Sequence, residues 1–412
     1  MTLIQTFIKA WQSFDYQKKQ DLSLLSGVMF FLLMGYPFIR STSTALFLEA
    51  HGASQSPLVW CLSVVGLAGA ISLLNYWQQR LSLHRLFLVT SASSLMLMSF
   101  FAIGFEGNPN FAFGLYIVKE IFIVLLVHMC IGYLNTIVSL DEARKLYGPF
   151  GAIGSLGGVI GGMGTSHFSG MYSVITVLGI GLCLVVVASF LFYKTSRKYN
   201  LNLIERKVQK SPLASLKNIK GYVACLILII CFSQFVINLA NFKFNLLFSE
   251  LIVGAEKKTQ FLGQLYSALN FVSLLIQVFV VPFVLSRLTI PVLHRTVPIF
   301  YLIVSLICFG LMGHLLLGVA AGFMLFKAVD YSLFSVLKEL LYFPLDIHQK
   351  YGAKYLVDMV FYRFAKGLIS LYLVFMQSHF MVNLLLATSI VLWLLTLVPL
   401  IHLGQKLQAT KT

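Results

Sequence analysis

The residues best suited to chemistry in this 412-residue chain are ionisable side chains that lie inside apolar sequence. The densest example is residues 326–346, FKAVDYSLFSVLKELLYFPLD, where Lys327, Asp330, Lys338 and Glu339 occur in a segment long enough to cross a bilayer. Insertion scales put the cost of a charge at a membrane helix centre on the order of 2.5–3.5 kcal/mol. Such groups are therefore retained where they face a protein interior or a water-filled path.

Helical geometry then decides which of these charges lie together. At α-helical spacing, Lys327, Asp330 and Lys338 fall on one face and Glu339 lies off it. Two interpretations stay open, a structural ion pair buried between helices or the lining of a solute pathway. We favour the pathway because similar charges recur in other apolar segments.

The recurring charges have a sign bias. With the four above, the deeper groups are seven cations and four acids: Arg40, Lys119, Lys243, Lys327, Lys338, Arg363 and Lys366 against Glu120, Asp330, Glu339 and Asp358. Seven minus four leaves three positive charges in excess, and a cavity with surplus cations favours an anionic solute. We expect Lys119, Lys327 and Lys338 to contact it.

The remaining charged positions receive other roles. We expect these residues to take part in proton coupling or in ion pairs that switch during transport: Glu120, Asp330, Glu339, Asp358 and Arg363. Lys354 and Asp358 can pair at i, i+4 spacing. Arg40 either extends to the headgroups as an anchor or faces the cavity as an outer gate and solute contact.

Amide side chains could supply specificity. Asn238, Asn241 and Asn245 recur at three- and four-residue spacing and form a polar stripe, and Gln264 lies in the next apolar segment. We expect Asn238, Asn241 and Gln264 to bind the solute through hydrogen bonds. Interhelical hydrogen bonding is the alternative for the stripe.

Composition identifies the elements that must position these residues. Hydrophobic residues make up 58% of the chain and charged residues 11%, with a mean hydropathy of +0.87. Soluble domains contain roughly 25% charged residues, so the chain is a multi-pass membrane protein. Its six cysteines lie in apolar runs without ligand spacing, and we expect no metal and no cofactor.

Apolar stretches of about 20 residues occur twelve times. We place these spans at residues 22–47, 57–77, 84–105, 111–134, 150–168, 171–193, 221–248, 261–285, 291–317, 318–343, 351–375 and 380–402. Lys and Arg concentrate in alternate loops, which predicts that both termini are cytoplasmic; the net charge of +16 is thus an orientation signal and does not indicate nucleic acid.

The longest basic loop divides the chain near its midpoint. We expect an amphipathic interfacial segment at residues 1–21, a six-helix bundle at 22–193, a basic cytoplasmic loop at 194–220 and a second bundle at 221–412. Residues 140–148, LDEARKLYG, and 345–352, LDIHQKYG, follow the fourth and tenth spans and indicate internal repetition. The predicted fold is an all-α, twelve-helix, 6+6 major facilitator fold.

Two local features add to this picture. Pro37 removes a backbone donor and should kink or break the first span. The fifth span is rich in glycine, and the spacing of Gly154, Gly158 and Gly162 permits close helix contact.

Several short runs carry a family resemblance. Tyr331-Ser332-Leu333-Phe334, Lys338-Glu339 and Tyr342 with Pro344-Leu345-Asp346 stand in the tenth span, Asp141-Glu142-Ala143-Arg144-Lys145 follows the fourth, and Ile237-Asn238-Leu239 lies in the seventh. The sequence resembles the nucleotide (ATP/ADP) translocase family, a branch with a major facilitator fold. The resemblance implies exchange of nucleotides or related phosphorylated metabolites and places Glu120 and Lys338 at charged positions of that family.

The chain departs from this family at two charged places. The family typically has an Arg-Asp-Thr-Lys-Asp run after its first span, where this chain has Arg40-Ser41-Thr42-Ser43-Thr44. Asn241 replaces the acidic residue of the span-seven motif. Losing a cation that would face phosphates weakens the case for a triphosphate in particular.

The function expected from these observations is non-enzymatic. We expect a secondary transporter of an anionic organic solute, nucleotide-like or phosphorylated, that works by alternating access and draws on antiport or symport. The alternatives are a proton-coupled importer or exporter of a polycarboxylate or carboxylate siderophore, and a non-transporting membrane scaffold. We expect a monomer in the lipid bilayer of a cell inner membrane, with the solute and protons as its partners.

Overall fold

A computed structural model describes residues 14–196 and 214–409 of the chain. The interfacial helix expected at residues 1–21 lies largely outside the described residues; residues 16–21 belong to the first long helix. The expected basic loop lies mostly outside them as well, and its end, Ala214–Ile219, forms a short 3₁₀ helix.

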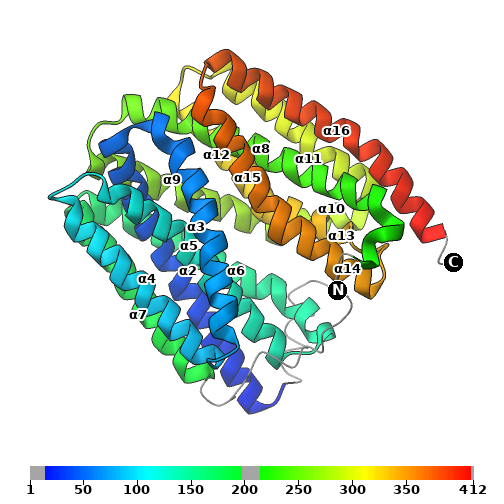
Figure 1. The fold of residues 1–412 in the computed structure, drawn as a ribbon, viewed down its shortest axis with the longest axis horizontal. Coiled ribbons are helices and arrows are strands. Elements are labelled where there is room, and N and C mark those ends of the chain that lie inside the picture. Colours follow the sequence, from blue (N-terminus) through cyan, green and yellow to red (C-terminus); the bar gives the residue numbers. More distant parts are fainter. Residues whose placement is uncertain (1–13, 197–213, 410–412) are drawn as a thin grey trace. The chain divides into compact units, whose positions relative to one another are not determined.

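The described chain is built of helices and contains no strand (Figure 1). Seven long helices precede the first interruption of α geometry: α2 (Tyr16–His51), α3 (Ser56–Gln78), α4 (Leu83–Phe105), α5 (Phe111–Ile137), α6 (Leu140–Ser169), α7 (Val174–Ser196) and α8 (Lys220–Leu251). The short 3₁₀ helix η1 (Ala53–Gln55) joins α2 to α3. These seven helices correspond to the first seven expected spans.

Four of the five remaining long segments contain a π-helical stretch. They are α9–η3–α10 (Ala255–Leu275, Ile276–Val280, Val281–Arg287), α11–η4 (Ile290–Val304, Ser305–Leu311), α12–η5–α13 (Leu316–Val329, Asp330–Phe334, Ser335–Leu340), α14–η6–α15 (Ile347–Lys354, Tyr355–Phe361, Tyr362–Phe375) and α16 (His379–Ala409). Twelve helical segments therefore match the twelve expected spans, which confirms the all-α membrane fold.

Surface chemistry agrees with a lipid environment. Ten segments of the described chain are long and apolar enough to cross a membrane; the glycine-rich α6 and the charged α14–α15 segment are the other two. Large apolar side chains face outward, among them Ile103 at 73% exposure and Phe375 at 77%. Lipid satisfies such side chains, whereas every backbone polar group must bond within a helix.

Contacts divide the chain into two compact units. Within the described residues, the first consists of residues 14–51, 65–196 and 252–274, and the second of residues 52–64, 214–251 and 275–409. The first part of α3 thus packs with the second unit, and most of α9 packs with the first. The division at residues 22–193 and 221–412 stays a prediction about the fold's two repeats.

The first unit is assembled around α2, which contacts α5, α6 and α7. Pro37 lies inside this helix, which continues to His51, so the expected break does not occur. The hydroxyls of Thr42 and Ser43 donate to the carbonyls of Phe38 and Ile39 within the same buried stretch. Pro37 cannot donate to the carbonyl of Leu33, four residues earlier, and the helix continues without that one bond.

Glycines on α6 set the spacing to two neighbouring helices. A Cβ on Gly161 would lie 2.0 Å from the carbonyl oxygen of Met34 on α2, and one on Gly162 would lie 2.6 Å from the backbone nitrogen of Ser267 on α9. Gly158 likewise faces Asn270 of α9. The predicted close packing through this helix is therefore present, and it faces α2 as well as α9.

The second unit is assembled around α8, which contacts α12, α15 and α16. Aromatic rings fill its interior: Tyr301 stacks on Phe326 with ring centroids 4.3 Å apart and meets Trp393 edge-on at 5.6 Å. In Figure 1, α8, α11 and α16 of this unit run alongside one another. This packing fixes the helices that carry the charged residues of the tenth and eleventh spans.

Candidate functional site

Lys119 is the most deeply buried cation among the expected site residues. Its side chain is 1% exposed on α5, and its ammonium donates to the Thr44 hydroxyl at 2.8 Å. Glu120 lies 3.3 Å away, and the ring of Tyr116 is 3.5 Å from the same nitrogen. A buried charge is tolerated when it is paired and hydrogen-bonded. Lys119 and Glu120 thus form a compensated pair inside the first unit.

Arg40 is held against aromatic rings. Its guanidinium carbon lies 4.0 Å from the ring centroid of Tyr266 on α9 and 5.7 Å from that of Tyr36, one turn earlier on α2. Stacking on an aromatic face fixes the plane of a guanidinium while its N–H edge stays available to an oxyanion. Arg40 is half-buried, so the headgroup anchor and the cavity contact both remain open interpretations.

The second unit brings four charges of the tenth and eleventh spans together. The Lys338 ammonium on α13 lies 2.8 Å from Oδ1 of Asp358 on η6, and Lys354 lies 2.5 Å from Glu339. Lys354 and Asp358, which sequence spacing would allow to pair along one helix, therefore each pair across to the neighbouring helix. The short turn at residues 341–346 brings the two helices side by side and makes these partners available.

Asp330 opens the π-helical segment η5 and is 6% exposed. Lys327 and Lys338 both interact with it electrostatically, as do the nearby tyrosines Tyr301 and Tyr362. The side chain of Lys327 also lies 5.2 Å from the ring of Tyr331. Asp330 is thus a buried carboxylate on the same helical segment as two expected solute contacts, Lys327 and Lys338.

The amide stripe on α8 is used mostly for structure. Asn238 is buried and donates to the carbonyl of Gln234 on its own helix, at 2.7 Å. Asn245 donates to the hydroxyl of Ser56 on α3, at 3.3 Å, which is the interhelical bonding considered above. Asn241 is half-buried, as are Arg363 and Lys366 on α15, while Gln264 on α9 is exposed.

Lys243 carries a further charge on α8. Its ammonium donates to the side chain of Asn383 on α16 and lies 3.4 Å from the carbonyl oxygen of Phe309, inside the π-helical segment η4. A π turn shifts the hydrogen bonding of the backbone, so a side-chain donor at this carbonyl helps to satisfy it. Lys243 therefore joins three segments of the second unit.

Sequence reasoning missed a charged contact in the first unit. The ammonium of Lys258 on α9, 3% exposed, pairs with Glu49 near the end of α2. Glu49 also accepts the backbone N–H of Gly254 at 3.2 Å, where φ is +93°, a conformation that favours glycine. Glu49, an acidic residue near the end of the first span, was the signal in the sequence. Glu250 and Glu256 lie closer to Lys258 in the sequence, so pairing within the loop was the simpler expectation.

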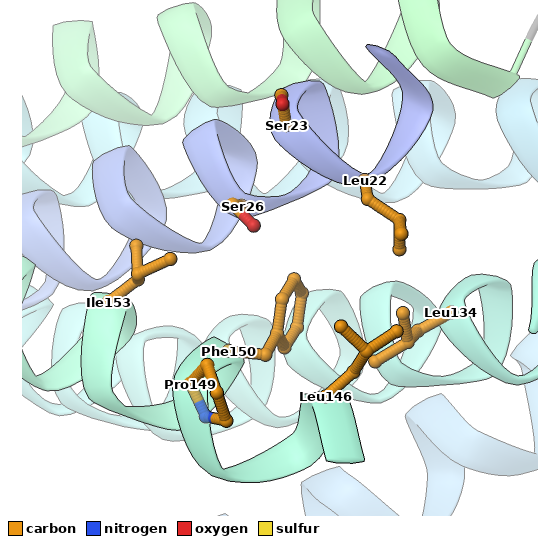
Figure 2. Close-up of a pocket in the computed structure, with 8 residues that line it drawn as sticks. All are labelled: Leu22, Ser23, Ser26, Leu134, Leu146, Pro149, Phe150 and Ile153. Carbon is orange, nitrogen blue, oxygen red and sulfur yellow. The ribbon is translucent and has the colours of Figure 1, made fainter. Parts of the chain in front are cut away.

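The first unit also contains a cavity of about 260 Å³ (Figure 2). Six apolar side chains and two serines line it: Leu22, Ser23, Ser26, Leu134, Leu146, Pro149, Phe150 and Ile153. Figure 2 shows the apolar groups of α6 facing α2 across it. It lacks the cations that an anionic solute requires and contains no expected site residue.

These elements together define a class of protein. The described residues form twelve helical segments, ten of them long and apolar enough to cross a membrane, and this is the architecture of the major facilitator fold. Solved structures with this fold match nearly the whole chain. A mutant of the nucleoside transporter NupG has a TM-score of 0.65 at 13% identity, covering 94% of this chain and 99% of that one.

Two further structures have comparable scores. A D-xylose–proton symporter has a TM-score of 0.65 at 13% identity, covering 92% of this chain and 96% of its own, and a bacterial metal transporter has 0.64 at 12%, covering 95% and 99%. A search against curated protein sequences finds no match. At these identities the likeness establishes the fold alone.

The family follows from the sequence match. The model of the TLC ATP/ADP transporter family matches residues 106–403, more than half of the chain. The chain therefore belongs to the TLC ATP/ADP transporter family and is a multi-pass membrane transporter, not an enzyme. The resemblance seen in the sequence is confirmed.

Proposed function

We propose that the protein carries an anionic organic solute, nucleotide-like or otherwise phosphorylated, across its membrane by alternating access. Family membership supports this solute class, and the cationic side chains Lys327, Lys338 and Arg40 supply groups that can bind phosphate or carboxylate. The observation that carries the proposal is Lys338, whose 19% exposed side chain is held by a carboxylate on the next helix.

Exposure separates the expected cations into two kinds. Lys119 is 1% exposed and compensated within its own helix and α2, so it holds α2 against α5. Lys338 and Lys327 are half-buried and can exchange partners with an incoming anion at lower cost. We therefore place the principal solute contacts on α12–α13 and assign Lys119 a supporting role.

A second candidate function is favoured by a specific observation. Four small uncharged residues, Ser41 to Thr44, fully buried or nearly so, occupy the place where the family typically has charged residues. A site with fewer cations suits a polycarboxylate better than a triphosphate. Proton-coupled transport of a polycarboxylate or carboxylate siderophore is therefore the alternative, with Asp330 or Glu120 as the coupling group.

A thermal-unfolding screen of the purified protein in detergent tests this proposal. ATP, ADP, citrate and inorganic phosphate are compared with uncharged adenosine. We expect stabilisation by phosphorylated solutes, loss of that stabilisation in Lys338→Gln, and its retention in Lys350→Gln, which removes a charge over the Phe343 ring instead. Citrate alone would select the second candidate, and stabilisation by adenosine alone would overturn both.

Membrane orientation remains part of the proposal. The basic loops predict cytoplasmic termini in a cell inner membrane. Labelling of single cysteines placed at Arg80 and Gly107, which follow α3 and α4 and so lie at opposite ends of a membrane span, tests it in intact cells with an impermeant maleimide. We expect labelling at residue 107 and protection at residue 80; the reverse pattern would invert the topology.

A further inference from the structure

Asp358 forms an ion pair with Lys338, the lysine that the proposed function assigns to solute binding. Its Oδ1 lies 2.8 Å from the Lys338 ammonium, and the two side chains are 26% and 19% exposed. The pair is therefore neither sealed in the interior nor fully solvated. Exchange of the carboxylate for another anion can take place there without first unfolding the helices around it.

A second contact orients Asp358 toward Lys338. The hydroxyl of Tyr342 donates to the same Oδ1 at 3.3 Å, and Tyr342 itself is fully buried. The main chain beside it is fixed as well, because the Tyr222 hydroxyl on α8 donates to the carbonyl of Leu341 at 2.7 Å. Tyr342 therefore holds the carboxylate at a defined place on η6.

The geometry points to Asp358 as an internal counter-ion that competes with the anionic solute for Lys338. When no solute is bound, the carboxylate neutralises the lysine and keeps it from being an unpaired charge in the membrane. A solute phosphate or carboxylate that reaches Lys338 displaces Asp358. The inference rests on the proposed function, and it adds the residue that sets how tightly the solute is held.

Competition of this kind has a consequence for transport. An isolated lysine would bind an anion tightly and release it slowly, which is unfavourable for a carrier. An internal carboxylate weakens solute binding in the ground state and replaces the solute as it leaves, so release is faster. Removal of Asp358 should therefore tighten binding and slow turnover together.

The neighbouring pair provides a matched control. Glu339 follows Lys338 on the same helix and pairs with Lys354 at 2.5 Å, with side-chain exposures of 46% and 34%. Glu339→Gln removes the same charge a short distance away and leaves the Lys338–Asp358 pair in place. A general effect of surface potential would appear in Glu339→Gln as strongly as in Asp358→Asn.

The experiment measures the affinity of the purified protein for ADP and for inorganic phosphate by calorimetry in detergent. For Asp358→Asn we expect a Kd roughly fivefold to tenfold lower than for the wild type, because the solute no longer has to displace the carboxylate. A tenfold change in Kd corresponds to about 1.4 kcal/mol of binding free energy. Glu339→Gln should change the Kd by less than about twofold. Asp358→Glu, which keeps the charge, should restore weak binding.

The unfolding temperature without ligand and the transport kinetics of the same variants provide two further measurements. Asp358→Asn should unfold at a lower temperature without ligand and recover more stability from phosphate than the wild type does, since phosphate then replaces the missing carboxylate. In proteoliposomes KM and kcat should both fall. Tyr342→Phe, which keeps the ring and removes only the hydroxyl, should shift binding in the same direction by a smaller factor.

The outcomes separate this inference from the proposed function. If the wild type binds ADP or phosphate and Asp358→Asn binds them no more tightly than Glu339→Gln does, Asp358 does not compete for Lys338, and the proposed function stands. If neither the wild type nor Asp358→Asn binds any of these anions, both are overturned. Weaker binding by Asp358→Asn would mean that the carboxylate supports the site.

Discussion

The two compact units hold their charged residues on different kinds of helix. In the first unit the described helices keep α geometry, and Lys119 pairs with Glu120 beside it on α5. In the second unit four π-helical segments interrupt the long helices, and Asp330 and Asp358 lie within two of them. π-helical turns inside α-helices are frequent at functional sites.

The difference shows in how polar groups find their partners. Charges of the second unit pair between helices, as in Lys338 with Asp358, and side chains reach the main chain of π segments, as Gln277 of η3 does at the carbonyl of Tyr331 in η5, 3.4 Å away. In the first unit Lys119 is 1% exposed and pairs with Glu120 next to it on α5, whereas the pairs Lys258–Glu49 and Lys18–Glu142 join different helices near the helix ends. We infer that the first unit supplies rigidity and the second contains the exchangeable contacts.

The largest loss of stability is expected from adding a side chain at Gly161, where α6 packs closely against α2. Gly161→Ala places a methyl group 2.0 Å from the carbonyl oxygen of Met34, so α2 and α6 must separate. Overpacking costs about 1–3 kcal/mol and more where backbone is the obstacle, so we expect a loss of at least about 3 kcal/mol. Thermal unfolding of the purified variant in detergent measures it.

Gly151→Ala is the matched control on the same helix. Outside the adjacent residues and the backbone of its own helix, no atom lies within 4 Å of a Cβ at that position, so alanine should be neutral or stabilise the helix by up to about 1 kcal/mol. Equal unfolding temperatures for the two variants would contradict the close packing of α6 against α2.

Replacing a paired glutamate by glutamine should lower the stability of the protein by different amounts in the two units, and both losses should be smaller than that of Gly161→Ala. Glu120→Gln removes a partner of the buried Lys119, and we expect a loss of about 2–3 kcal/mol, because an undercompensated buried charge is costly. Glu339→Gln breaks a pair whose members are 34% and 46% exposed and should cost at most about 1 kcal/mol. Unfolding temperatures measured side by side should therefore rank Glu120→Gln well below Glu339→Gln; the opposite ranking would reverse the comparison.

The smallest effect concerns pH at the start of α6. The Lys18 ammonium donates to both carboxylate oxygens of Glu142, at 2.8 and 2.7 Å, and these bonds hold the pKa of Glu142 below its ordinary value of 4.5. The pair therefore stabilises the fold above about pH 4.5, and this contribution is lost as pH falls through the lowered pKa.

Because the pair is partly exposed, its contribution should be at most about 1 kcal/mol. Glu142→Gln should unfold at a lower temperature than the wild type at neutral pH, and the gap should close on acidification below pH 4.5. A gap that widens toward acid would show that the protonated carboxyl is the stabilising form.

Helix positions could be predicted because a membrane span needs about 20 consecutive apolar residues, and such a run can be recognised from the local sequence alone. The span expected at residues 84–105 is α4 (Leu83–Phe105), and the one at 380–402 lies within α16. Pro37 was expected to kink or break the first span; the break does not occur, because α2 continues to His51, and the kink stays a prediction. The π-helical segments were not foreseen, since no local pattern distinguished Asp330–Phe334 from α-helix.

The charged residues could be named but their partners could not. Spacing along one helix allowed Lys354 to pair with Asp358, while the turn at residues 341–346 gives each a partner on the adjacent helix. Glu49 and Lys258 are 209 positions apart, and only folding brings them together. Pairing across helices depends on which faces meet, and one sequence does not contain that information.

A counterflow assay tests most directly whether Lys338 belongs to an anion pathway. Proteoliposomes loaded with ADP are placed in labelled ATP, ADP or citrate, and uptake is compared among the wild type, Lys338→Gln and Lys350→Gln. We predict uptake of at least one labelled anion by the wild type and Lys350→Gln, and its loss in Lys338→Gln at equal insertion. Equal uptake by Lys338→Gln and the wild type would contradict the assignment of this lysine to an anion pathway.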